Sequence, residues 1–78
     1  MLEEIKELLV NELNIANPDD ITMDSNLTND LGLNSLELAE LVVNCEEKFD
    51  IEIDEEVLHE LITIGDVVRY LEEKLDRR

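Results

Sequence analysis

Apolar residues recur three or four positions apart in three stretches of the chain, the spacing that gathers side chains on one face of a helix. In the first stretch, charged residues separate Leu2, Ile5, Leu9 and Leu13. This pattern predicts a helix that starts at Leu2 and ends near Asn14.

Residues 15–30 form a polar stretch that interrupts the helical spacing. It contains a proline and several Asn and Asp residues, whose side chains bond the local backbone and favour turns. We expect a long loop, held against the core by Ile15, Ile21 and Leu27.

The second helix should begin at Asn34 or Ser35 and run to about Asp50. Asn34 can cap the free amides of the first turn, and Glu37, three residues later, completes a capping-box pattern. At about 100° per residue, one broad face of this helix should point to the core. It carries Leu38, Leu41, Val42, Cys45 and Phe49.

The last third of the chain predicts one short and one longer helix. The segment 51–61 has a brief alternation and then Val57, Leu58 and Leu61, which indicates a short third helix, with a strand across residues 51–53 as the weaker alternative. Thr63 and Asp66 are typical of a helix start. The apolar face that follows consists of Ile64, Val67, Val68, Leu71 and Leu75. Arg77 and Arg78 close this helix, at the end where positive charge suits the helix dipole.

These elements predict an all-α fold, a small bundle of three main helices plus one short helix, in a single domain spanning residues 1–78. A chain of 78 residues buries only roughly 60% of the surface that it exposes when unfolded, so we expect no deep catalytic cleft. A hydrophobic content of 44%, with one Pro and two Gly, is enough for a core and indicates no disordered linker.

Charge narrows the choice of partners. The chain has 22 acidic and 6 basic residues, a formal net charge of -16, which repels nucleic acid and anionic membranes and attracts basic surfaces. The same self-repulsion favours a monomer. Runs of charged residues commonly do no more than keep a face of the protein solvated. The positions of the acidic residues must therefore show whether they bind a partner.

The single cysteine, Cys45, excludes an intrachain disulfide and a zinc site built from cysteines. The N-terminus lacks the pattern of a signal peptide, and no window is long enough to span a membrane. We therefore expect a cytoplasmic protein. Asp50, Glu52 and Asp54 alternate like the start of a calcium loop, but the glycine and the bidentate glutamate of that loop are absent, and no metal site is predicted.

A second apolar stripe lies on the second helix, roughly opposite its core face. Leu36, Ala39 and Val43 form it, and carboxylates including Glu40 and Glu47 lie beside it. Either the long loop covers this stripe or another protein docks there. The surrounding carboxylates favour docking to a basic partner, because an apolar strip with a charged rim is typical of an interface.

Ser35 stands at the N-terminal edge of this stripe. Serine is a common helix cap, but Asn34 competes for that role. The sequence around Ser35, GLNSL, is not the G-x-S-x-G motif of hydrolases, and the only histidine is His59. No catalytic residue is predicted.

Residues 30–53, DLGLNSLELAELVVNCEEKFDIEI, resemble the second-helix region of acyl carrier proteins, and the likeness continues through ITIGDVVRYL to cover essentially the whole chain. Leu31, Gly32, Ser35 and Leu36 match the family motif. Asn34 stands where aspartate is usual in the family.

The resemblance implies a non-catalytic carrier. A phosphopantetheinyl transferase would join 4'-phosphopantetheine to Ser35, and the thiol of that arm would carry an acyl group as a thioester, in fatty acid biosynthesis or in a specialised polyketide, aminoacyl or lipid-modifying pathway. Acyl-transferring, synthase or ligase enzymes with basic patches would dock on the second helix. The residues expected to take part are Asn34, Leu36, Glu37, Ala39, Glu40, Val43, Glu46 and Glu47.

Three further expectations follow. Asn34 lacks the charge that the resemblance assigns to transferase recognition, which predicts a dedicated transferase, or a specialised pathway rather than general fatty acid synthesis. The core of Leu, Ile and Val could part to shelter an acyl chain. The alternative function is an acidic helical interaction adaptor whose Ser35 is never modified.

Overall fold

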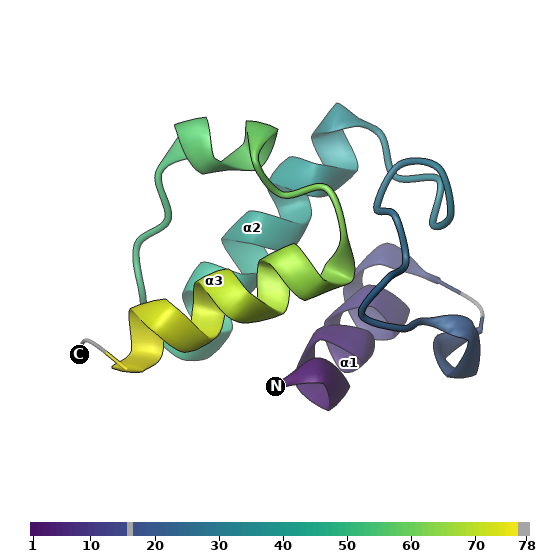
Figure 1. Ribbon diagram of the computed structural model, residues 1–78, viewed down its shortest axis with the longest axis horizontal. Coiled ribbons are helices and arrows are strands. Elements are labelled where there is room, and N and C mark those ends of the chain that lie inside the picture. The colour runs from purple at the N-terminus through teal and green to yellow at the C-terminus, as the bar shows by residue number, and fades with distance from the viewer. Residues whose placement is uncertain (16, 77–78) are drawn as a thin grey trace.

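Three α-helices surround one apolar core in the computed structural model, which describes residues 1–15 and 17–76 (Figure 1). The helices are α1, Leu2–Leu13, α2, Ser35–Phe49, and α3, Ile64–Asp76. Two short 3-10 turns lie between them, η1, Pro18–Asp20, and η2, Glu55–His59. The described residues contain no strand, only an isolated bridge between Asn26 and Thr63. The predicted bundle of three main helices and a minor one is confirmed.

Helix α1 has the predicted bounds. It ends because Asn14 adopts the left-handed conformation, with φ of 57°, which asparagine tolerates better than most residues. The amides of Asn14 and Ile15 then both donate to the Leu9 carbonyl. These bonds turn the chain back over the last turn of α1 and close its C-terminal end.

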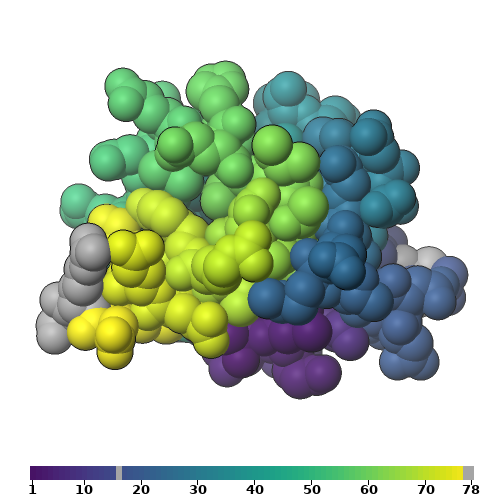
Figure 2. Space-filling view, in the orientation of Figure 1, coloured from purple at the N-terminus to yellow at the C-terminus, as the bar shows by residue number. Residues whose placement is uncertain are grey.

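The long loop is held in place from within, as predicted, because Ile21 and Leu27 are buried. Ile15 is only partly buried, and Leu33 adds a third buried anchor that the polar pattern did not predict. The loop also bonds to the start of α3, where the Gly65 amide donates to the Met23 carbonyl at 2.7 Å. Figure 2 shows the loop, in blue, lying against α3 and α1.

Glycine is required at position 65 by this close approach. A Cβ atom there would lie 2.9 Å from the Met23 carbonyl oxygen, which is closer than carbon and oxygen pack. The absence of a side chain at Gly65 therefore lets the long loop contact the first turn of α3.

The start of α3 is the predicted capping box. The Thr63 amide donates to Asp66 Oδ2 at 3.0 Å, and the Asp66 amide donates to Thr63 Oγ1 at 3.2 Å. The Ile62 amide and the Arg69 guanidinium also bond the Asp66 carboxylate. Hydrogen bonds from the backbone of Thr63 and Ile62, and then the Arg69 contact, lower the pKa of Asp66. Arg77 and Arg78, expected to close this helix, lie outside the described residues.

The segment between α2 and α3 contains the predicted short helix but not the strand that was its alternative. The short helix is the 3-10 turn η2, and the strand across residues 51–53 is wrong, since the Ile53 amide donates at 2.8 Å to the Glu46 carboxylate rather than to another strand. Val57, Leu58 and Leu61 are partly buried against the core. A few apolar contacts thus hold this segment in place.

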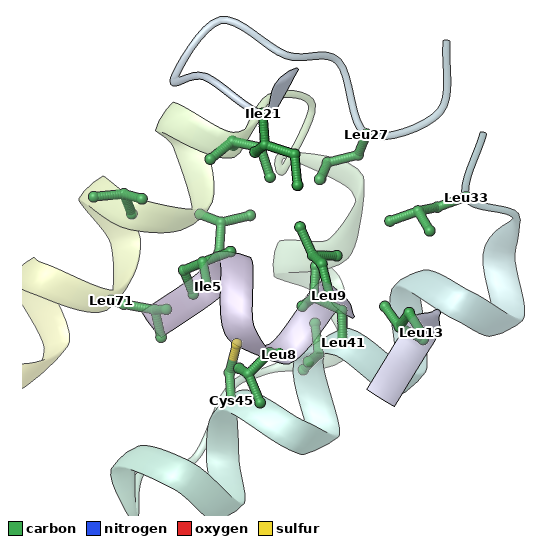
Figure 3. Close-up of a cluster of buried hydrophobic side chains, with 14 of the residues drawn as sticks. Ile5, Leu8, Leu9, Leu13, Ile21, Leu27, Leu33, Leu41, Cys45 and Leu71 are labelled. Atoms are coloured by element: carbon green, nitrogen blue, oxygen red, sulfur yellow. The ribbon is translucent and has the colours of Figure 1, made fainter. Parts of the chain in front are cut away.

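The core forms where α1 meets the other elements. Figure 3 shows Ile5, Leu8 and Leu9 of α1 between side chains from α2, α3 and the long loop. The predicted core face of α2 is confirmed. Its Leu41, Val42 and Cys45 are buried, and its Leu38 and Phe49 are partly buried. On α3 the predicted face is buried except for Leu75, which is partly exposed. Within the described part of the chain, no helix has the length and apolar character that crossing a bilayer demands.

Candidate functional site

Ser35 is the first residue of α2, and its position follows from the residues before it. Gly32 has φ of 70°, a conformation that favours glycine, and turns the chain. Leu33 is then only 3% exposed, and its amide donates to the Leu27 carbonyl at 3.0 Å. Because Leu33 is anchored in the core, the helix start two residues later faces solvent, and Ser35 is exposed.

Asn34, not Ser35, caps α2. The Glu37 amide donates to Asn34 Oδ1 at 2.9 Å, and the Asn34 amide donates to Glu37 Oε1 at 3.1 Å, which is the predicted capping box. Within residues 1–15 and 17–76, the Ser35 hydroxyl has no hydrogen-bond partner. The hydroxyl is therefore both accessible and free of a structural role.

This helix start fits an attached phosphodiester. The first amides of an α-helix have no partner within the helix, and the positive end of the helix dipole favours an anion there, by about 0.3 to 1 kcal/mol. The Asn34 side chain occupies the Glu37 amide, and the amides of Ser35 and Leu36, in the same turn as the Ser35 hydroxyl, remain available to an anion. Residues at this site could thus hold a phosphopantetheine arm by its phosphate.

The second stripe of α2 is open to solvent. Leu36 is 77% exposed, Val43 is 48% exposed and Ala39 is partly exposed. The long loop does not cover them, so of the two alternatives for this stripe the docking surface is the one that the exposure fits. Large apolar side chains exposed in a row are characteristic of an interaction site.

The acidic residues expected around this stripe have different environments. Glu40 and Glu47 are exposed. Glu37 is engaged in the capping box, and Glu46 is partly buried and bonded to the Ile53 amide. Glu40 and Glu47 are therefore free to meet a partner, whereas Glu37 and Glu46 already stabilise the fold.

One residue beside the stripe was not foreseen from sequence. Glu12, in the last turn of α1, lies with the stripe along a shallow surface groove between α1 and α2. The residues that line the groove are Glu12, Leu36, Ala39, Glu40, Val43 and Asn44. Nothing in the sequence around Glu12 marks it, because its neighbours in the groove are more than twenty positions away.

The other candidate chemical groups lie elsewhere. Cys45 is 1% exposed, and burial, with a smaller effect of the Glu46 charge, raises the pKa of its thiol to about 12. Cys45 thus lies in the core as predicted, and a thiol in this environment is unreactive. His59 is exposed on η2. In the part of the chain that the structure describes, no three His, Cys, Asp or Glu side chains are grouped so that they could hold a metal ion.

Comparison with known proteins agrees with the geometry. A family model described as "Phosphopantetheine attachment site" matches residues 3–71. An acyl carrier protein from Wolinella succinogenes is 46% identical over 72 residues, which cover 92% of this chain and 93% of that protein. One from Campylobacter hominis is 44% identical over 72 residues, 92% of this chain and 90% of the relative. A third, from a Sulfurovum species, is 40% identical over 72 residues, 92% and 95% of the two chains.

Proposed function

The chain belongs to the acyl carrier protein family, and from that premise we propose that Ser35 is the residue to which its 4'-phosphopantetheine arm is attached. Proteins of this family are carriers rather than enzymes, and the thiol of the arm holds the acyl group as a thioester. The observation that carries the assignment to Ser35 is its exposed hydroxyl, which has no partner within the described residues because Asn34 caps the helix.

The chain offers its own control for this assignment. Its only other serine, Ser25, is buried, and its hydroxyl accepts a hydrogen bond from the Thr22 amide at 2.9 Å. A transferase could not reach Ser25 without unfolding the loop.

The test is intact mass spectrometry after incubation with coenzyme A and a phosphopantetheinyl transferase. Wild type and Ser25→Ala should each gain the mass of one phosphopantetheine, and Ser35→Ala should gain nothing. If wild type gains no mass with any transferase tried, the chain is the unmodified acidic adaptor instead. If Ser35→Ala is still modified, the attachment site is another residue.

Partner enzymes dock, in this proposal, on the exposed stripe of α2. Leu36, Ala39 and Val43 provide an apolar anchor, and Glu40 and Glu47 provide the charge that steers a basic patch toward it. A carrier has to bind successive enzymes briefly, and charge-steered contacts give fast association with modest affinity. We propose that the chain does this as a single monomeric domain in the cytoplasm.

The pathway follows from Asn34. A transferase that reads a carboxylate at this position would lose a charge-assisted contact, worth about 1 to 3 kcal/mol where it is buried and hydrogen-bonded. Asn34 retains the cap but supplies no charge. This favours a dedicated transferase, or a specialised pathway rather than general fatty acid biosynthesis.

The acyl chain has a place to shelter only if the core opens. An apolar cavity between α2, η2 and α3 has a volume of about 10 Å³, room for no more than about one water molecule. Side chains from the three elements line it, among them Leu38, Cys45, Leu58 and Tyr70. An acyl chain would therefore have to move η2 or α3 outward. Core chemical shifts that are the same in the free-thiol and long-acyl forms would exclude this shelter.

A further inference from the structure

The groove between α1 and α2 extends the docking surface beyond α2. The two helices run in opposite directions, since Lys48 near the end of α2 contacts Glu7 in the middle of α1 at 3.9 Å, and Glu12 near the end of α1 lies beside the first half of α2. The groove encloses about 450 Å³. Its apolar side chains come from α2, and α1 contributes a carboxylate.

Among residues 1–15 and 17–76, no cation compensates the charge of this groove. Each Lys and Arg among the described residues has a partner elsewhere. The pairs are Lys6 with Glu3, Lys48 with Glu7, Arg69 with Asp66 and Lys74 with the Tyr70 ring. In residues 1–15 and 17–76, neither Glu12 nor Glu40 has a cationic partner. Both carboxylates border the same groove and repel each other.

A second groove of similar size shows that this combination is not general to the surface. That groove, of about 410 Å³, lies on α1 and η1 and contains Lys6 together with its acids. None of the strongly exposed large apolar residues lines it. Of these two grooves, the one between α1 and α2 is the one that joins exposed aliphatic side chains to uncompensated carboxylates from two helices.

We infer that Glu12 is a docking residue, and that enzymes which act on this carrier bind the groove with a helix that presents an aliphatic side chain beside an arginine. The inference rests on the proposed function. Leu36, Ala39 and Val43 follow helical spacing, and the small Ala39 between two larger residues lets a partner helix approach closely. The planar guanidinium of arginine donates in several directions and can bond Glu12 and Glu40 together.

The experiment measures the kinetics of Ser35 modification for charge variants of Glu12, with the transferase found to modify wild type. We expect Glu12→Gln to raise KM about threefold and Glu12→Lys about tenfold, with kcat unchanged, because a rim charge acts on encounter and binding. The difference from wild type should shrink as salt is added, since ions screen exposed charges. Both variants should fold, because Glu12 is exposed and a lysine near the end of a helix is favourable.

Glu72→Gln and Glu72→Lys are the matched controls. Glu72 is an exposed helical glutamate on α3, which contributes no residue to the groove, so its variants make the same change of net charge at another place. If the Glu72 variants raise KM as much as the Glu12 variants do, only net charge matters and the inference is wrong. The same holds if the Glu12 variants have the wild-type KM.

A binding measurement keeps the inference separate from the proposed function. If no transferase modifies wild type, the proposed function fails, and the groove is probed by NMR with an amphipathic helical peptide in which arginines flank a leucine stripe. Amide shifts at Glu12 and Val43 that Glu12→Lys abolishes support the groove. Equal shifts in wild type and Glu12→Lys overturn it.

Discussion

Asn34 caps α2, and substitution can separate this structural role from the effect that we propose its lack of charge has on modification of Ser35. Asn34→Ala removes the oxygen that accepts from the Glu37 amide at 2.9 Å. The reciprocal bond, from the Asn34 amide to Glu37 Oε1, is made by the backbone and survives the substitution. Asn34→Asp keeps both bonds and adds a charge.

The two substitutions should change the stability of the protein by different amounts. Loss of one cap bond costs about 1 kcal/mol, within a range of about 0.5 to 2, and lowers Tm by about 4 to 8 °C in a domain of this size. For Asn34→Asp, the helix dipole contributes about 0.3 to 1 kcal/mol of stabilisation. Repulsion from the nearby Glu37 carboxylate and from the net charge of -16 opposes it. The stability of Asn34→Asp should therefore stay close to that of wild type.

The rate of modification should rise in Asn34→Asp and fall in Asn34→Ala. With a transferase that reads a carboxylate, Asn34→Asp should raise kcat/KM by about 5- to 150-fold, the equivalent of about 1 to 3 kcal/mol. Asn34→Ala should slow modification, because the turn that presents Ser35 frays without its cap.

The assay is thermal unfolding of each variant together with kcat/KM for the transfer to Ser35, followed by intact mass. Asn29→Asp is the control, because Asn29 is exposed in the long loop and its substitution adds the same charge away from Ser35. Equal kcat/KM for wild type and Asn34→Asp would remove the reason for proposing a dedicated transferase. An unchanged Tm in Asn34→Ala would show that the cap does not stabilise α2.

Three further results are expected. Asp66→Ala should lower the free energy of unfolding by about 1 kcal/mol at neutral pH, as for loss of a cap. The folded-state pKa of Asp66 is below its ordinary value of 3.8. The stabilisation by its carboxylate is therefore fully present above pH 3.8 and is lost as pH falls through the lower, folded-state pKa. Urea titrations of wild type and Asp66→Ala should thus converge in acid. Cys45 should resist Ellman's reagent at pH 8 in the native chain and react at once in denaturant, because its thiol is buried with a pKa of about 12; rapid native labelling would contradict this. Raising NaCl from about 0.01 to about 0.1 M shortens the screening length from about 30 to about 10 Å and so weakens repulsion between the acidic residues. Tm measured by calorimetry should therefore rise. An unchanged Tm would mean that this repulsion does not limit stability.

The parts of the fold that the sequence predicted well depend on neighbours within one turn. The caps at Asn34 and Thr63 act through residues three positions away, and the apolar spacing of α1, α2 and α3 reports directly which side of each helix is buried. Local hydrogen bonds and helical periodicity are properties of a short segment, and they survive folding because the tertiary contacts agree with them.

The candidate site divides along the same line. The sequence by itself determined that a serine follows a capping asparagine at the head of a helix, with an apolar stripe and acids behind it. It could not show that the Glu46 carboxylate bonds the Ile53 amide, so that residues 51–53 form no strand. Nor could it show that the long loop bonds to the start of α3. Only the tertiary structure brought Glu12 to the stripe of α2. These contacts join residues far apart in the chain, and their existence depends on how the helices pack rather than on any local preference.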